Sequence, residues 1–265
     1  MHPRVSLHQV AFLNESTTAF LGHCLDIGVQ QATLVTPVLM QDGGIEEAAR
    51  CGVRITSINH PFAVQPDLAH DDGRATEVLH GVIDAALALG NPDIYLLTGA
   101  RGTLDWEHAA ERFGELIAPC RDRADTVGVR LLVENASAFN ADIHIAHTLA
   151  DTITLASMVG IGLCVDVHAC WAEAGLSELL RRAMPRTGLV QVSDYVLGDR
   201  CAPCRAVPGD GAIPLQRIIG DVLDAGYTGV FDIELVGPRI DAEGPRAATA
   251  RAARRVSDIL TELGV

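Results

Sequence analysis

The chain has 265 residues, of which 48% are hydrophobic, so it is long enough to bury the core of one large α/β domain over residues 1–265. Its formal net charge of −14, with no Arg-rich run, opposes contact with the phosphate backbone of nucleic acid and argues against a nucleic-acid partner. All 20 basic residues are Arg, which excludes the lysine of a Schiff base or of a P-loop.

Short runs of β-branched residues or leucine recur along the chain, and amphipathic segments separate them. Several runs are apolar almost throughout, which is typical of strands buried on both faces. Eight runs are expected to be strands: 5–10, 33–36, 54–59, 93–98, 130–134, 162–167, 189–193 and 229–235.

Helix start and stop signals lie between these runs. Asp105 precedes the amphipathic segment WEHAAERFGELIAPCRDRA, and Gly128, Gly160 and Gly226 mark helix ends. Eight strands that alternate with helices predict a (β/α)8 barrel. A doubly wound open sheet is the alternative, but the first strand lacks the GxGxxG turn that is the main reason to prefer it.

The sequence does not predict a membrane protein or a secreted protein. No apolar run is long enough to cross a bilayer, and residues 1–10 lack the pattern of a signal peptide. Seven cysteines, an odd number, do not form a disulfide framework in a chain of this size. We therefore expect a cytoplasmic protein with reduced thiols and no membrane contact. Homo-oligomer formation is compatible with these features.

Polar side chains stand near the ends of the last four expected strands. Glu134 ends the fifth, Asp166 lies in the sixth, Gln191 in the seventh and Glu234 in the eighth. The C-terminal ends of all barrel strands open on one mouth. Three carboxylates brought together there repel one another, and a divalent cation relieves that repulsion. The pattern predicts a metal centre, and the alternative is that each acid pairs with an arginine.

The segment from Leu131 to Arg239 resembles the sugar phosphate isomerase/epimerase-like, or xylose isomerase-like, TIM barrels, which are related in fold to apurinic endonucleases and ketose 3-epimerases. The resemblance rests on the motifs LLVEN, LCVDVH, QVSD and GYTGVFDIEL. Members usually carry a His where Gln191 stands, so the resemblance implies an all-oxygen ligand set of Glu134, Asp166, Gln191 and Glu234. Such a set favours Mg²⁺ or Mn²⁺ over Zn²⁺. Alternatively, Gln191 marks a weakened or lost metal site.

The resemblance implies a metal-dependent isomerase or epimerase that acts on a small carbohydrate-like substrate, a sugar or polyol-like keto compound, through an enediolate. Glu134 and Glu234 would exchange protons as acid and base. Two alternatives stay open. One is a lyase or dehydratase that acts on a keto-sugar or inosose-like substrate through the same enolate. The other is a non-catalytic sugar-binding barrel subunit that lost its metal at Gln191.

Further side chains are candidates for substrate contact. Arg205 lies in the loop RAVPGDGAIPL, which is similar to a family segment that places an Arg near substrate oxygens. His168 follows Asp166 by two residues, whereas the family commonly spaces them by three. The remaining candidates for the mouth or its walls are His60, His8, Tyr195 and Trp171.

Two other motifs are assigned structural roles. Cys201-Ala-Pro-Cys204 has the spacing of a redox or zinc motif, but no second CxxC or CxH lies nearby, so we interpret it as a loop turn. His144 and His147 have helical spacing after the fifth strand, which predicts a solvated or packed helix face.

Overall fold

The computed structural model describes residues 1–265 and closes eight parallel strands into a barrel, in the order β1 to β8. Pairing of β1 with both β2 and β8 completes the closure. This confirms the (β/α)8 barrel and excludes the open sheet. The strands are β1 (Val5–His8), β2 (Gln31–Val35), β3 (Arg54–Ala63), β4 (Asp93–Gly99), β5 (Leu131–Glu134), β6 (Gly162–Asp166), β7 (Thr187–Val192) and β8 (Phe231–Ile233).

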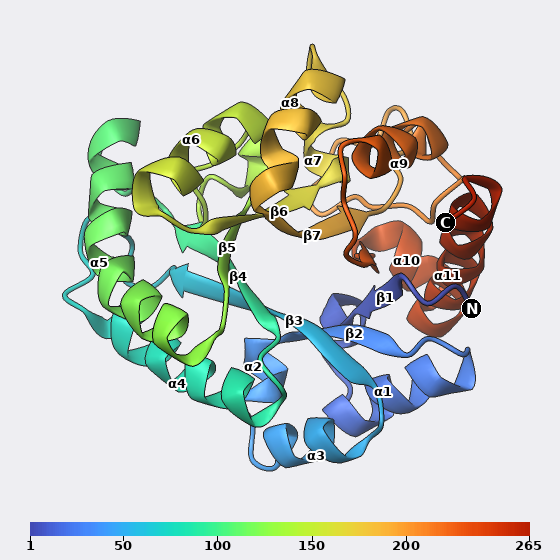
Figure 1. Cartoon of the computed structure of the whole chain (residues 1–265), viewed down its shortest axis with the longest axis horizontal. Helices are drawn as coiled ribbons and strands as arrows, with labels where there is room; N and C mark the ends of the chain where they lie inside the picture. The colour runs from blue at the N-terminus through green and yellow to red at the C-terminus, as the bar shows by residue number, and fades with distance from the viewer.

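Helices surround the barrel on its outside (Figure 1). None of them is both long enough and apolar enough to span a membrane. The α-helices are α1 (Thr17–Asp26), α2 (Thr36–Leu39), α3 (Gly44–Arg50), α4 (Arg74–Ala88), α5 (Trp106–Val127), α6 (Leu149–Val159), α7 (Val167–Cys170), α8 (Leu176–Ala183), α9 (Leu215–Asp224), α10 (Pro238–Glu243) and α11 (Pro245–Glu262). The 3₁₀ turns are η1 (Gln9–Phe12), η2 (Ala138–Asn140) and η3 (Met184–Arg186).

Local signals explain where α5 begins and ends. The Asp105 side chain accepts a hydrogen bond from the amide of His108 at 2.9 Å, and Gly128 ends the helix at a φ of 75°. The strand β3 is longer than expected, because the residues from His60 to Ala63 continue its pairing with β4. Pro61 is tolerated there because its fixed φ is compatible with extended backbone.

The barrel interior is filled by alternate residues of each strand, as the two-residue period of a strand requires. One half holds the small cluster Tyr95, Leu132, Cys164 and Leu189 from β4 to β7. The other half is polar: Ser6 of β1 donates to Asp232 of β8 at 2.7 Å, and Thr33 of β2 lies 2.6 Å from Ser57 of β3. A separate core of 68 buried residues packs the helices against the barrel.

Candidate active site

Three carboxylates converge at the C-terminal end of the barrel. Glu134 ends β5, Asp166 ends β6 and Glu234 directly follows β8, and an oxygen atom of each lies within 4.8 Å of the others. Their side chains are largely buried: Glu134 is 4% exposed, and the side chains of Asp166 and Glu234 are 2% and 12% exposed. The cluster is therefore shielded from most of the solvent that would otherwise screen its charge.

Burial and mutual repulsion disfavour ionisation of this cluster. The pKa of Glu134 is raised well above its ordinary value, first by burial and then by the charges of Glu234 and Asp166. Burial also raises the pKa of Glu234, although the nearby Arg205 opposes this shift. Bound protons or a bound cation can relieve the repulsion. Three buried oxygen ligands fit a hard divalent cation.

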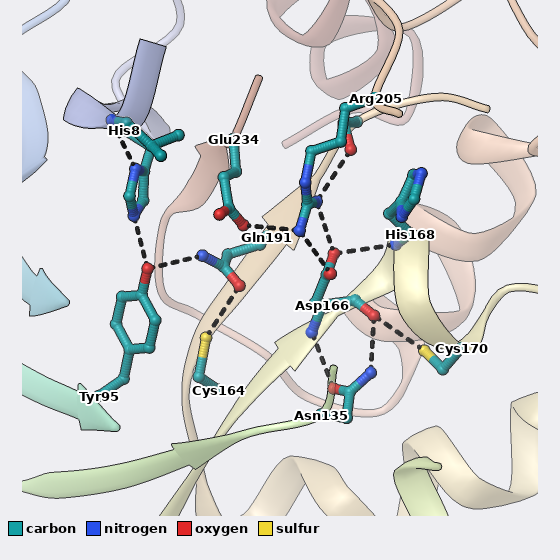
Figure 2. Close-up of polar contacts among 12 residues, drawn as sticks. His8, Tyr95, Asn135, Cys164, Asp166, His168, Cys170, Gln191, Arg205 and Glu234 are labelled. Carbon is teal, nitrogen blue, oxygen red and sulfur yellow. Dashed lines mark hydrogen bonds and ion pairs between the residues drawn. The ribbon is translucent and has the colours of Figure 1, made fainter. Parts of the chain in front are cut away.

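Arg205 supplies part of the compensating charge. Its Nη1 and Nη2 atoms lie 3.1 and 2.8 Å from the two oxygens of Asp166, and Nη2 lies 3.0 Å from Glu234 (Figure 2). Nη1 also donates to Ser193 at 3.0 Å. Burial tends to lower the pKa of the guanidinium, but the charges of Asp166 and Glu234 raise it above its ordinary value. The pairing of acids with arginine therefore holds for two of the three carboxylates.

The loop that carries Arg205 is organised by Asp194, a buried residue just after β7. Its backbone exchanges two hydrogen bonds with Ala206, both of 2.8 Å. Its carboxylate accepts hydrogen bonds from the backbone amides of Tyr195, Gly209, Gly211 and Ile213 at 2.8 to 3.0 Å. Four amides on one carboxylate hold the loop over the barrel mouth and so fix the position of Arg205.

Gln191 lies inside the barrel beside the cluster, with both ends of its amide occupied. Its Nε2 donates to the Tyr95 hydroxyl at 3.1 Å, and its Oε1 accepts from the Cys164 thiol at 3.3 Å (Figure 2). The same hydroxyl lies 2.5 Å from Nε2 of His8. Because Nδ1 of His8 accepts from the Val10 amide, Nε2 carries the proton and donates to Tyr95.

A cavity of about 410 Å³ opens above the carboxylates. Of the sequence candidates for substrate contact, His168, Arg205 and His8 line it, whereas His60, Tyr195 and Trp171 do not. His60 follows the inward-facing Asn59, so strand alternation turns it away from the barrel interior, and its Nδ1 lies 3.2 Å from the Thr36 hydroxyl. The lining includes His8, Asn59, Leu97, Glu134, Ser137, Phe139, Asn140, Asp166, His168, Cys201, Cys204, Arg205 and Glu234.

His168 presents an unused nitrogen at this cavity. Its backbone amide donates to Asp166 at 3.0 Å, which caps α7, and its Nε2 atom is buried without a hydrogen-bond partner. Burial lowers the pKa of His168 to about 4. Tyr195 packs edge-on against its ring at 5.9 Å between centroids, and Trp171 packs against Tyr195 at 6.3 Å. The two aromatic residues thus support His168.

Two residues that the sequence analysis did not assign to the site also hold the strand ends. Asn135 donates to the carbonyl of Asp166 and accepts from its amide, both at 2.9 Å. Nε2 of His144 lies 2.7 Å from the carbonyl of Glu134. The helix expected at His144 and His147 is wrong: both lie in the loop before α6, because Thr148 caps a helix that begins at Leu149. The sequence did contain a signal for Asn135, because it is a polar residue directly after the strand-end Glu134.

The chain also matches a known protein family. A model of the xylose isomerase-like TIM barrel family matches residues 44–259. The chain belongs to this family. Fructoselysine 3-epimerase of Escherichia coli O157:H7 is 24% identical over 159 residues, which are 59% of this chain and 54% of the epimerase. The match thus spans about half the length of that relative.

Two solved structures of this barrel type superpose on nearly the whole chain. An IOLI protein with a bound zinc atom gives a TM-score of 0.81 at 16% identity and covers 98% of this chain and 99% of its own. An L-ribulose 3-epimerase gives a TM-score of 0.77 at 16% identity and covers 99% of this chain and 96% of its own. At such identities these structures show the shared fold.

Proposed function

We propose that this xylose isomerase-like barrel is a metal-dependent isomerase or epimerase of a small keto-sugar or polyol-like substrate. The observation that carries the proposal is the convergence of Glu134, Asp166 and Glu234 at the mouth of a barrel with a cavity above them. The epimerases among its relatives support the same reaction class. Because one hydrophobic core joins buried residues from β1 to α11, we infer that residues 1–265 act as one domain.

Glu134, Asp166 and Glu234 would hold the cation, and Gln191 is a proposed fourth ligand that must first give up its contact with Cys164. An all-oxygen set favours Mn²⁺ or Mg²⁺. A divalent cation here would polarise a substrate carbonyl and ease the loss of a proton from the adjacent carbon.

The proton transfers are assigned to the two glutamates. Glu134 and Glu234 come from β5 and β8, so they approach the cavity from different sides of the barrel. Both carboxyl groups line the cavity, where each can accept a proton from a bound substrate and return one to it. One glutamate would take the proton from one face of the substrate and the other would return it to the opposite face.

Substrate orientation is assigned to the guanidinium and imidazole groups at the cavity wall. The planar guanidinium of Arg205 can bind two substrate oxygens once it releases the two oxygens of Asp166. The unpartnered Nε2 of His168 can bind a hydroxyl group. Tyr195 and Trp171 act by supporting His168. We propose no direct substrate contact for His60.

Titration calorimetry with Mn²⁺ and Mg²⁺ tests this proposal. We expect one cation per chain, and we expect loss of binding in Asp166→Asn, which removes a carboxylate charge while it keeps the size of the side chain. Asp210→Asn is the matched control, because Asp210 pairs with Arg251 on the surface. Absence of cation binding in the parent protein would contradict the proposal and favour a sugar-binding subunit.

A further inference from the structure

Two cysteines share one turn at the mouth of the carboxylate cavity. Cys201 and Cys204 lie in the loop between β7 and α9, and both line the cavity. Cys201 is the one exposed cysteine of the chain, and Cys204 is half-buried. Four of the other five are buried, and Cys51 is half-buried. The proposed reaction assigns no role to this pair, although its loop position agrees with the turn expected from the sequence.

A bend in the backbone separates the two cysteines, which are three residues apart in the chain. The backbone bends at residues 201–203, and the Cys201 sulfur folds back to lie 3.6 Å from the carbonyl oxygen of Pro203. Burial raises the pKa of Cys204, and the charge and hydrogen bonding of the Cys201 thiol raise it further, as expected for neighbouring sulfurs. First and fourth residues of a turn have Cα atoms within about 7 Å, which is close to the span of a disulfide.

The Cys204 end of the turn is anchored to the active site. Arg205, the next residue, donates its backbone amide to the carbonyl of Val236 at 3.1 Å and its guanidinium to Asp166. One peptide unit therefore separates Cys204 from a residue whose guanidinium contacts two of the three carboxylates.

The middle of the turn is held from its other side. The carbonyl oxygen of Pro203 would lie only 2.7 Å from a Cβ atom on Gly237, so the turn packs closely on the loop after β8. A movement that joins the two sulfurs therefore involves the exposed Cys201 end, which borders the cavity mouth, and pulls on Cys204, which directly precedes Arg205.

We propose that Cys201 and Cys204 form a reversible dithiol–disulfide centre that alters the carboxylate cavity through Arg205. The oxidant is a low-molecular-weight disulfide, RSSR. The Cys201 thiolate attacks one sulfur of RSSR, which forms a mixed disulfide and releases RS⁻. The Cys204 thiolate then attacks the Cys201 sulfur, which closes the intramolecular bond and releases the second RS⁻. The two cysteine protons end on two RSH molecules, so the two-electron oxidation of the pair balances the reduction of RSSR.

The arginines around the turn make this bond directly measurable. Tryptic cleavage after Arg200 and Arg205 releases residues 201–205, which contain both cysteines of the pair and no other. The full-length protein is incubated with hydroxyethyl disulfide, treated with an alkylating reagent and digested. We expect an unalkylated peptide that is two hydrogen atoms lighter than its reduced form, and dithiothreitol should restore two alkylation sites.

Three variants separate ring closure from general thiol reactivity. Cys204→Ser should stop at the mixed disulfide on Cys201, and Cys201→Ser should leave the peptide unoxidised. Cys51→Ser is the matched control, because Cys51 is also half-buried but lies outside the cavity lining, and it should oxidise as the parent does. A stable mixed disulfide in the parent protein, or bonds formed equally at other cysteines, would overturn the proposal.

The coupling to the cavity has its own readout. Amide hydrogen exchange at residues 205–213 should change by about fivefold or more between the reduced and oxidised proteins, within the usual range of coupling between sites. Equal amide exchange in the reduced and oxidised proteins would show that the pair does not affect the cavity, and it would also overturn the proposal. Neither readout needs metal binding or turnover, so failure of the proposed function would be seen separately, as absence of Mn²⁺ binding to the reduced protein.

Discussion

The guanidinium of Arg205 binds the carboxylate of Asp166 at two points, with Nη1 to Oδ1 at 3.1 Å and Nη2 to Oδ2 at 2.8 Å. A divalent cation at this site would use the same carboxylate. A bound cation would therefore compete with Arg205 for Asp166 or share it.

Arg205→Lys should lower kcat/KM by about 10- to 100-fold, since a hydrogen bond to a charged group is worth about 1.5–3 kcal/mol and lysine loses the two-point contact. Steady-state kinetics on the best keto-sugar from a screen measure this. The matched control is Arg239→Lys, because Arg239 makes a similar contact with Asp199, at 2.7 and 3.0 Å, with a half-exposed side chain. Unchanged kinetics in Arg205→Lys would remove Arg205 from the substrate site.

Gln191→His should raise the affinity for Co²⁺, Ni²⁺ or Zn²⁺ relative to Mg²⁺, because imidazole suits transition metals better than an amide oxygen does. The variant also gives up the amide contacts with Tyr95 and Cys164, so the new side chain is free to turn toward the carboxylates. Calorimetry with each cation measures the change. Gln216→His, on the exposed surface of α9, controls for binding to any added histidine. Equal selectivity in both variants would mean that position 191 is not a ligand.

Asp194→Asn should loosen the loop that carries Arg205, because one carboxylate oxygen becomes an NH₂ donor that faces backbone amides. We expect a loss of about 1–3 kcal/mol of unfolding free energy, the usual cost of leaving buried donors unpaired. Amide exchange at Gly209 and Gly211 should accelerate, while exchange in the strands should follow global stability alone. Asp199→Asn is a surface control. Slow exchange at both glycines in Asp194→Asn would show that the carboxylate does not hold the loop.

The sequence was sufficient to predict the barrel and the approach of Glu134, Asp166 and Glu234. Short β-branched or Leu-rich runs marked the strands, and the C-terminal ends of parallel strands meet at one mouth whatever the loops do. The model of the xylose isomerase-like TIM barrel family matches residues 44–259, which include all three carboxylates. Contacts between strands were therefore readable without coordinates.

Contacts that depend on loop conformation or on particular side-chain rotamers could not be predicted from the sequence. Arg205 is 39 residues from Asp166 in sequence, and their contact depends on the four amides that Asp194 gathers. The hydrogen bonds of Gln191 depend on which way its amide turns inside the barrel. The direction of the His60 side chain depends on the register of β3 with β4, because β3 continues beyond His60. The strand expected from the sequence ended at residue 59, so it did not determine this direction.

His60 should make the protein sensitive to acid. Burial lowers the pKa of His60 to about 4, whereas an exposed histidine titrates near 6.5. Below the latter value the unfolded chain binds a proton that the folded chain does not, so the stability present above pH 6.5 is lost as pH falls toward 4. We expect a loss of about 2 kcal/mol from this group between pH 7.5 and pH 5.

Denaturant unfolding at the two pH values measures this loss. His60→Gln should have a stability that depends less on pH than that of the parent, whatever its absolute stability. His70→Gln is the control, because the His70 side chain is 66% exposed. The buried His8 and His144, whose pKa values burial also lowers to about 4, keep part of the acid sensitivity in every variant. An unchanged pH slope in His60→Gln would contradict the assignment.

We propose that Glu134 and Glu234 move protons at a carbon atom beside a substrate carbonyl. Glu134→Gln and Glu234→Gln should each lower turnover by about 10²- to 10⁴-fold, the usual worth of general acid–base catalysis, while the fold is kept.

The most direct test is incorporation of solvent deuterium. The Mn²⁺-loaded protein is incubated with a keto-sugar substrate in D₂O, and NMR follows the carbon next to the carbonyl from early times. We expect deuterium at that carbon in the parent protein, and strongly reduced incorporation in both glutamine variants. Turnover of the substrate by the parent protein with no deuterium at that carbon, even at early times, would contradict the proposal.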